Sequence, residues 1–292
     1  MPGIFILSLD CEGKWGVADH VNDGHHKTLS DTYLRRAYYD ILKTLDDFGV
    51  SGTFAITSMF ALSPDELLAL PIDQITEVLP YTKAAFKDIQ NLNFDGWSAP
   101  WMRGLISSNH EIGCHGVTHT PWDAMSIAQA RFELSLVSVD SRQTFIFPRN
   151  RINHLDLLTE LGFKGFRLPP QKRSRLSSLA REFNVFAQAQ ENPTPTVLQA
   201  VPAGHFINWR SGLRRAVPPA LTRLRARRIL ADAARNNGVA HFWTHPENIA
   251  SAPSTLENLS AVIEEATALR DQGKIVCMTQ AEYCDHIRFK NM

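Results

Sequence analysis

The sequence of 292 residues predicts an α/β fold, a barrel of about seven parallel strands enclosed by helices. Three observations predict it. Short apolar runs alternate with longer amphipathic segments along the chain. Repeated strand–helix units of this kind form a parallel sheet covered by helices. Polar residues suited to catalysis follow several of the apolar runs, and ligands bind at the carboxyl ends of strands in such folds.

The strands are predicted from short apolar runs bounded by polar or turn-forming residues. The first, Ile4–Leu9, is followed by Asp10 and has no basic region before it, so we expect a strand and not a signal peptide. The other expected strands are Thr53–Thr57, Glu111–His115, Gln143–Pro148, Lys164–Leu168, Val239–Thr244 and Lys274–Met278.

The helices are predicted from apolar residues at helical spacing. The clearest runs from Leu34 to Phe48, and Ser30 or Asp31 can cap it. Further helices are expected over 64–108 with a break near 95–100, over 123–139, 153–161, 219–236 and 255–272, and at the end of the chain. Residues 169–200 are expected to be irregular. Because no linker or repeat divides the sequence, we expect one domain over residues 1–292.

The composition excludes several classes of protein. Apolar residues make up 44% and charged residues 21%, which is typical of globular chains and not of disordered ones. Lys plus Arg and Asp plus Glu are 30 each, so the net charge of zero argues against a nucleic-acid partner. No apolar stretch is long enough to span a bilayer. The four cysteines form no C-x-x-C pair, which favours the reducing cytoplasm.

Two histidines after the third expected strand are candidate metal ligands. His115 and His119 are four residues apart, a spacing that fits either metal binding or a structural role. An H-E-x-x-H zinc helix is excluded, because Cys114 stands where that motif needs histidine. A third ligand is available from Asp10 or Glu12. Residues two apart on a strand face the same way, so one carboxylate can be a ligand and the other a general base.

Two further residues follow other strands. His245 is either a general acid or simply a histidine at the start of a helix. Arg149 is either a surface charge or the ion-pair partner of a carboxylate at the same rim. Cys11 and Cys114 flank proposed site residues, and we interpret both as small buried apolar side chains.

These motifs together resemble the polysaccharide deacetylase family, carbohydrate esterases that share a chitooligosaccharide-deacetylase domain. The matching motifs occur in the same order as in the family and span most of the chain. They are most similar to those of the branch found in surface-polysaccharide and O-antigen biosynthesis. The matching stretches are Ser8–Glu12, Trp97–Pro100, His110–His119, Phe145–Asn150 and Phe242–His245.

The resemblance implies an incomplete (β/α)7-type, TIM-like barrel that removes an N- or O-acetyl group with the help of a divalent metal, which we expect to be Zn²⁺. By position in the motifs, it implies Asp10 as base, Glu12, His115 and His119 as metal ligands, Arg149 as the residue that orients the base, and His245 as acid.

A run of arginines leads to a prediction about the substrate. Residues 192–231 contain seven arginines and no acid, so this segment carries +7. It is either a solvated helix face or a surface that recognises an anion, such as an anionic glycan linked to a lipid or nucleotide carrier. A weak peripheral contact with an anionic membrane is a further reading.

The expected substrate-binding residues include tryptophans, which can stack on a sugar or lie in the core. We expect substrate contacts from Trp15, Asn150, Trp209 and Arg210. Trp97 and Trp101 could serve in the same way.

Two alternatives to a sugar deacetylase remain open. The same metal site could hydrolyse another C–N amide bond, in a formyl group or a cyclic imide. The domain could instead bind saccharide without catalysis, although a binding module has no need of a base such as Asp10.

Overall fold

The computed structural model describes residues 2–106, 109–137, 143–171, 179–180 and 182–289. Its centre is a nine-stranded sheet in which every paired strand runs parallel to its neighbour. The order is β6-β5-β4-β3-β2-β1-β8-β7, and β9 also pairs with β1. The bounds are β1 Gly3–Cys11, β2 Thr53–Ile56, β3 Glu111–Cys114, β4 Thr144–Phe145, β5 Gly165–Arg167, β6 Gln199–Val201, β7 His205–Phe206, β8 Val239–Thr244 and β9 Ile275–Met278.

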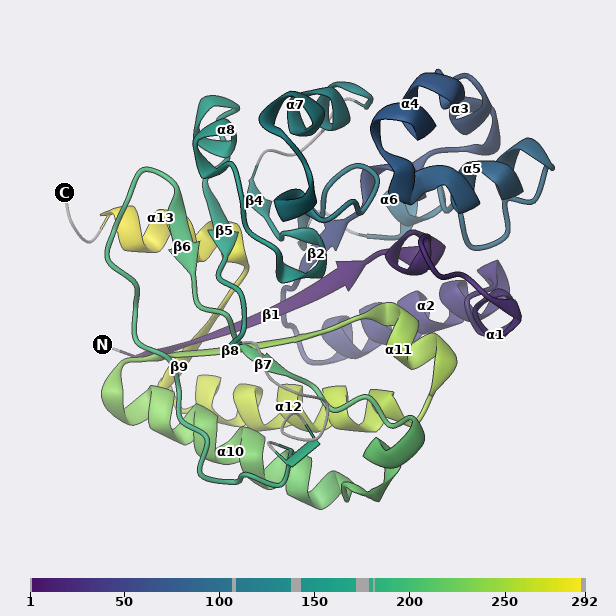
Figure 1. The fold of residues 1–292 in the computed structure, drawn as a ribbon. Coiled ribbons are helices and arrows are strands. Elements are labelled where there is room, and N and C mark those ends of the chain that lie inside the picture. Colours follow the sequence, from purple (N-terminus) through teal and green to yellow (C-terminus); the bar gives the residue numbers. More distant parts are fainter. Residues whose placement is uncertain (1, 107–108, 138–142, 172–178, 181, 290–292) are drawn as a thin grey trace.

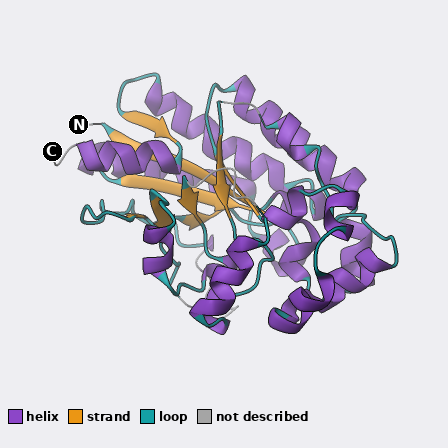
Figure 2. Ribbon diagram, turned by 90° about the horizontal axis from the view of Figure 1, so that it is seen from above, coloured by secondary structure: helices purple, strands orange, loops and turns teal. Residues whose placement is uncertain are grey.

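Helices enclose the curled sheet, as Figures 1 and 2 show. α10 and α12 pack side by side below β1 and β8 in Figure 1, while α7 and α8 lie above β4 and β5. The α/β fold class and the incomplete barrel predicted from the sequence are therefore confirmed. The helices are α1 Asp23–Thr28, α2 Asp31–Asp47, α3 Pro64–Leu68, α4 Ile72–Val78, α5 Lys83–Gln90, α6 Met102–Leu105, α7 Ile127–Ser135, α8 Leu155–Glu160, α10 Pro219–Asn236, α11 Pro246–Ser251, α12 Thr255–Arg270 and α13 Gln280–Phe289.

β1 is the central strand, and its nine residues are all buried. It pairs with β2 through Ser8–Cys11, with β9 through Gly3–Ile6 and with β8 through Ile4–Leu9. A strand buried on both faces reads as an almost continuous apolar run, which is why the sequence predicts it clearly. β2 ends opposite Cys11 and β8 ends opposite Leu9, so the residues that follow these three strands emerge at one rim.

The predicted strands are present, most with shorter bounds, but β6 and β7 were not predicted. They have three and two residues and include the polar Gln199 and His205, so no apolar run marks them. β6 pairs with β5 and β7 pairs with β8, at opposite ends of the strand order. The three residues 202–204 between them therefore cross the opening of the barrel. Residues 172–178 and 181, part of the segment expected to be irregular, lie outside the described residues.

The segment 64–108, expected to be mostly helical, contains several short helices with a break before α6, and residues 107–108 of that prediction lie outside the described residues. Pro64, Pro71 and Pro80 each stand at or just before the start of a helical segment, where a missing N–H costs least. The helix expected over 123–139 is shorter because Ser126 caps α7 with its side chain, and residues 138–139 of that prediction lie outside the described part. Among the described residues, no helix is both long enough and apolar enough to cross a membrane.

Candidate metal centre and active site

The register of the sheet brings the candidate residues together. Cys11 pairs with Ile56, Ile56 with Cys114, and Leu9 with Thr244. The next residues along these strands therefore leave the sheet at the same edge. Glu12 and His115 follow β1 and β3 directly, and His245 follows β8.

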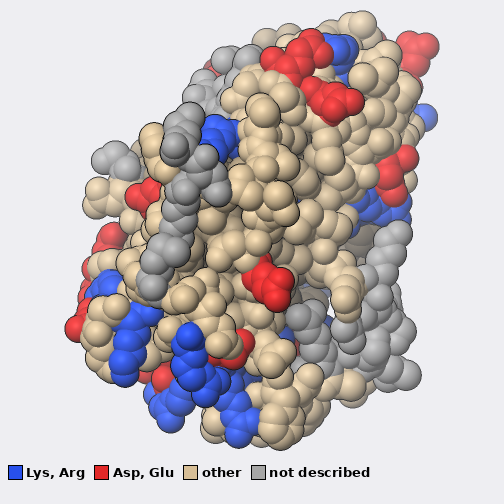
Figure 3. Space-filling model, turned by 90° about the vertical axis from the view of Figure 1, so that its left-hand side faces the viewer, with Lys and Arg blue, Asp and Glu red and all other residues tan. Residues whose placement is uncertain are grey.

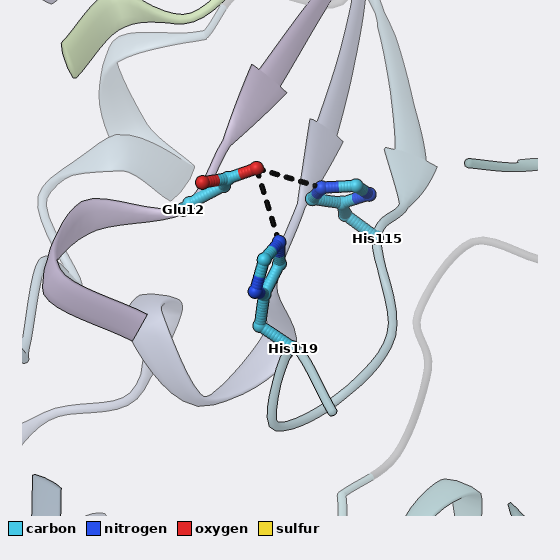
Figure 4. Close-up of side chains that lie close together, drawn as sticks. All are labelled: Glu12, His115 and His119. Carbon is cyan, nitrogen blue, oxygen red and sulfur yellow. Dashed lines mark hydrogen bonds and ion pairs between the residues drawn. The ribbon is translucent and has the colours of Figure 1, made fainter. Parts of the chain in front are cut away.

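The three expected metal ligands point toward one another (Figure 4). Glu12 Oε1 lies 3.0 Å from His115 Nε2 and 3.1 Å from His119 Nε2. One donor atom from each of the three lies within 4.8 Å of the others. The rings of His115 and His119 are almost fully buried, so these atoms are shielded from bulk water.

The protonation of His115 indicates that this cluster fits a cation. His115 Nδ1 lies 2.8 Å from the carbonyl oxygen of Ile146, which can only accept, so Nδ1 donates. A neutral ring then presents a lone pair on Nε2 to the carboxylate of Glu12. The Nε2 lone pair of His115 and the Glu12 carboxylate oxygen would repel each other at 3.0 Å. Either a second proton on the His115 ring or a cation between the two atoms removes this repulsion. Two imidazole nitrogens and a carboxylate oxygen form a ligand set that Zn²⁺ accepts.

The electrostatics of the ligands agree with this fit. Burial lowers the pKa of His119, which favours the neutral ring that a metal ligand needs. Burial raises the pKa of Glu12, but the facing His119 and His245 rings outweigh it and hold that pKa well below its usual value. Glu12 is therefore ionised at neutral pH, as a carboxylate ligand must be.

Glu133 of α7 fixes the loop between the two histidines. Its Oε1 accepts hydrogen bonds from the backbone N–H groups of Val117 and Thr118 and from Thr118 Oγ1, at 3.3, 2.9 and 2.6 Å. Its Oε2 accepts one from Trp122 Nε1 at 3.1 Å. The loop brings His119 into place with a left-handed backbone, φ 60°. A fully buried side chain thus determines the shape of the ligand loop.

Asp10 is held by Arg167 of β5. The two guanidinium nitrogens of Arg167 lie 2.7 and 2.6 Å from the two carboxylate oxygens of Asp10. Both side chains are buried, and the guanidinium also lies over the ring of Trp243 at 4.6 Å. Burial raises the pKa of Asp10, but the charge of Arg167 outweighs it, so the pKa is lower than usual. Asp10 is therefore an ionised, oriented carboxylate.

A chain of hydrogen bonds continues from Arg167 into the barrel. Arg167 Nη1 donates to Ser8 Oγ at 3.3 Å, and Ser8 Oγ lies 2.9 Å from His241 Nε2. His241 Nδ1 donates to the carbonyl oxygen of Pro202 at 2.6 Å. Nε2 of a neutral His241 is therefore the acceptor for the Ser8 hydroxyl. Burial lowers the pKa of His241 to about 3, so this ring stays neutral near pH 7.

His245 lies between the two carboxylates. Its Nε2 is 3.4 Å from Glu12 Oε1 and 3.9 Å from Asp10 Oδ2. Burial lowers the pKa of His245, but the charges of Glu12 and Asp10 outweigh it and raise that pKa to about 9. Asn248 Nδ2 lies 3.3 Å from His245 Nδ1 and orients the ring. The ring faces the site as a proton donor.

Glu247 supports the turn after β1. Its Oε1 accepts from the backbone N–H groups of Glu12 and Gly13, at 3.0 and 2.6 Å. Burial and the charge of Glu12 raise the pKa of Glu247 to about 7. Gly13 has a φ of 54°, and a Cβ there would lie 2.4 Å from the ring of Phe60. The turn therefore depends on glycine at this position.

Arg149 does not contact Asp10, contrary to the expectation from the motif. Its guanidinium forms an ion pair with Asp19 at the surface. Arg149 and Asn150 both have a φ of 55°, so the backbone is left-handed at both residues after β4. Arg167 takes the expected position beside Asp10. Asn150 does lie near the base, because its Oδ1 accepts a hydrogen bond from Arg167 Nη2 at 3.1 Å.

The expected substrate-binding residues lie in different places: some are near the candidate site and others are not. Trp15 is 1% exposed and packs edge-on against Trp97 at 5.5 Å, so it lies in the core and offers no face to a sugar. Trp209 lines a cavity beside Glu12 and His245. Arg210 is not among the residues that line this cavity, and its guanidinium contacts Glu257 at 3.3 Å.

Five of the seven arginines of the run share four carboxylates within the fold. Arg223 and Arg227 pair with Glu264 and Glu265 of α12, and Figure 3 shows Asp and Glu side chains among the Lys and Arg side chains at the lower edge of that face. Arg214 and Arg225 both contact the carboxylate of Glu182. Acidic residues from other segments therefore offset part of the positive charge that residues 192–231 carry in the sequence. This disfavours the predicted anion-binding surface.

The sequence analysis did not identify Arg167, Glu133, Glu247 or His241 as site residues. Arg167 carried a usable signal, because an arginine inside a short apolar strand needs a carboxylate partner. Glu247 lies two residues after His245, at the same end of β8 that the sequence analysis considered. Glu133 and His241 gave no signal, since polar residues in an expected helix or strand are common at the surface.

Comparisons with known proteins rest on the fold. No family model matches the sequence, and no curated protein matches it. The chain aligns over its full 100% with 93% of a protein from Mycobacterium smegmatis assigned as a polysaccharide deacetylase, with TM-score 0.62 and 16% identity. A protein from Pseudomonas aeruginosa PAO1 with the same assignment gives TM-score 0.56 and 11% identity over 98% of this chain and 91% of that one.

The Puue allantoinase gives TM-score 0.57 and 13% identity, over 98% of this chain and 90% of that one. At these identities the likeness concerns the fold. The chain has the fold of the polysaccharide deacetylases, as the resemblance of its motifs predicts.

Proposed function

We propose that this protein is a metal-dependent hydrolase that removes the acetyl group from an N-acetylated sugar. The observation that carries the proposal is the meeting of Asp10, Glu12, His115, His119 and His245 at one rim, although they come from three distant parts of the chain. A domain that only binds saccharide has no need of an oriented carboxylate beside a proton-donating histidine.

Glu12, His115 and His119 would hold the divalent cation. When bound, the cation supplies Lewis-acid polarisation of a carbonyl and lowers the pKa of water toward 7. Asp10 accepts the proton of the attacking water, because Arg167 fixes both of its oxygens and keeps the carboxylate ionised. His245 donates a proton to the departing nitrogen from the other side of Glu12.

The reaction balances with water alone. A C–O bond forms between water and the acyl carbon, the C–N bond breaks, and the products are acetate and the amine in its protonated form. The proton that Asp10 removes and the proton that His245 supplies leave the net protonation of the pair unchanged over one cycle.

The setting we propose is surface-polysaccharide or O-antigen biosynthesis in the cytoplasm. The resemblance of the motifs to that branch of the deacetylases supports it. Detection of the acetylated precursor in cells that lack the protein, and its loss on complementation, would test this setting.

The test of the activity is a paired measurement of metal content and acetate release. In Asp10→Asn we expect the metal to remain while acetate release falls by about 100-fold or more, because the base is removed and the ligands are intact. In His115→Ala we expect the metal to be lost as well. Full activity of Asp10→Asn would contradict the role of the base, and unchanged metal content in His115→Ala would contradict the ligand set.

A second candidate is hydrolysis of a small cyclic amide. The similarity in fold to an allantoinase favours including it. Assay of allantoin beside N-acetylated sugars separates the two, because only one class should be turned over at a rate that depends on Asp10.

A further inference from the structure

Two polar side chains lie in the core behind the candidate base. Ser8 of β1 and His241 of β8 are both 0% exposed. Neither is among the residues that line the cavity of about 580 Å³ beside Glu12 and His245, so a ligand in that cavity does not touch them. A hydroxyl and an imidazole in the core cost free energy unless both are hydrogen-bonded. Both are bonded here, and their partners show what the pair can do.

The direction of each hydrogen bond follows from the backbone of Pro202. Its carbonyl oxygen can only accept, so His241 Nδ1 carries the proton of the 2.6 Å contact. The ring is neutral, so Nε2 keeps its lone pair and the Ser8 hydroxyl donates to it at 2.9 Å. The oxygen of Ser8 therefore presents its lone pairs to Arg167 Nη1 at 3.3 Å. His241 thus sets Ser8 as an acceptor for the guanidinium.

The guanidinium of Arg167 is oriented by the contacts of its two terminal nitrogens. Its buried Nε has no hydrogen-bond acceptor among the described residues. Nη1 is shared between Asp10 Oδ1 and Ser8 Oγ, while Nη2 is shared between Asp10 Oδ2 and Asn150 Oδ1. Trp243 lies against the face of the group. Ser8 and Asn150 therefore fix how the guanidinium meets the carboxylate.

We propose that Ser8 and His241 are positioning residues for the base. His241 holds the Ser8 hydroxyl in the direction that accepts from Arg167, and Arg167 in turn aligns the carboxylate of Asp10 for the attacking water. The inference rests on the proposed function, because it assigns residues that support the same base. It also couples the base to residues 202–204, since the chain of hydrogen bonds ends at Pro202 in the segment that crosses the opening of the barrel.

The kinetic test separates positioning from substrate binding. A misplacement of about 1 Å can cost on the order of 100-fold in rate, so Ser8→Ala should lower kcat by about tenfold or more. KM should stay within about twofold and metal content should not change, because Ser8 neither lines the cavity nor belongs to the ligand set. Ser8→Thr keeps the hydroxyl and should restore kcat to within about threefold of the wild type.

The control for this test is Thr267→Val on α12. It removes a buried hydroxyl whose hydrogen bonds go to the backbone of its own helix, so kcat and KM should stay as in the wild type. Unchanged kcat in Ser8→Ala, or an equal fall in Ser8→Ala and Ser8→Thr, would overturn the inference.

A matched pair of glycine variants tests the far end of the chain of hydrogen bonds. Gly204 has a φ of 78°, and a Cβ there would lie 2.9 Å from His241 Cγ and 3.1 Å from Nδ1. Gly204→Ala should therefore displace the imidazole and lower kcat by about fivefold or more. Gly162 has a similar φ of 82°, but a Cβ there meets nothing within 4 Å, so Gly162→Ala adds backbone strain alone. Equal kcat in the two folded variants would contradict the coupling.

A measurement without turnover tests the hydrogen bonds themselves. In the full chain labelled with ¹⁵N-histidine, the signals of His241 are those that His241→Phe removes. We expect the proton on Nδ1 and a hydrogen-bonded lone pair on Nε2. Arg167→Lys keeps the positive charge but alters the contact with Ser8, so it should shift the Nε2 signal, and Ser8→Ala should abolish that response. A proton on Nε2, or the same response with and without the Ser8 hydroxyl, would refute the arrangement.

The inference and the proposed function fail in different ways. If the wild type releases no acetate from any N-acetylated sugar, the proposed function is wrong, while a response of His241 to Arg167→Lys through Ser8 still supports the chain of hydrogen bonds. If the wild type releases acetate and Ser8→Ala does so at the same rate, the function stands and the inference is wrong.

Discussion

Glu133 on α7 accepts three hydrogen bonds from Val117 and Thr118, in the loop that joins His115 to His119. A buried group outside a metal site that fixes the ligands typically contributes 10–100-fold to metal affinity. We therefore expect Glu133→Ala to weaken Zn²⁺ binding by about that factor and to cost on the order of 3 kcal/mol of stability, because buried donors lose their acceptor.

Competition with a chelating dye would measure the affinity, and urea unfolding the stability. Arg131→Ala, on the exposed side of the same helix, is the control, and it should change neither quantity appreciably. Unaltered metal affinity in a folded Glu133→Ala protein would show that the loop keeps its shape without Glu133.

Gly16 leaves room for the carboxylate of Glu12. A Cβ at position 16 would lie 1.9 Å from Glu12 Oε2, the mobile end of the side chain. Gly16→Ala should therefore displace the carboxylate and lower metal affinity by more than about tenfold, with little change in stability. Gly104→Ala is the matched control, since a Cβ there meets nothing within 4 Å. Equal metal affinities in the two variants would be inconsistent with this geometry.

Arg167 and Asp10 form a buried ion pair, which can be tested by replacing one partner and then both. Arg167→Met leaves an unpaired buried carboxylate, so we expect a loss of about 3–5 kcal/mol in the free energy of unfolding. Adding Asp10→Asn should restore most of that loss, because the uncompensated charge is then gone. Arg149→Ala, which breaks a partly exposed pair with Asp19, should cost at most about 1 kcal/mol. Denaturant titration of these three variants and of Asp10→Asn alone decides the matter, and additive losses in the double variant would argue against direct pairing.

His241 gives a pH dependence of known sign. Its pKa is about 3 in the fold against about 6.5 in the unfolded chain, so below pH 6.5 the unfolded state binds the extra proton. The stability from the neutral ring is therefore fully present above pH 6.5 and is lost as pH falls toward 3, by up to about 1.4 kcal/mol per pH unit. His241→Asn should lower this slope relative to the wild type when thermal unfolding is followed between pH 4 and 7. Parallel curves would show that another group carries the dependence.

The parts of the fold that the sequence predicts are those set by local pattern. β1 and β8 are mostly apolar runs, and α10 and α12 lie where helical spacing places them. β6 and β7 were missed because pairing with distant strands, rather than their own composition, makes them strands.

The site residues likewise include some that the sequence predicts and others that it does not. His115 and His119 could be chosen from spacing and from position after a strand, whereas the residues alone left Asp10 and Glu12 open and the family resemblance pointed to Glu12. The structure brings the donor atoms of Glu12, His115 and His119 together.

Arg167 carried a signal as an arginine inside a short apolar strand, but the family resemblance pointed instead to Arg149, which follows such a strand. The ion pairs decide between them, since Arg167 pairs with Asp10 and Arg149 with Asp19. The left-handed backbone at Arg149 and Asn150, two non-glycine residues, has no clear sequence signal.

The guanidinium beside Asp10 comes from β5, whereas the motif order pointed to the loop after β4. Neighbouring strands of a curled sheet deliver side chains to almost the same point, so an arginine on either strand can serve as the partner of one carboxylate. Distant relatives of this protein are therefore better recognised by where charged atoms lie in space than by the order of letters along the chain.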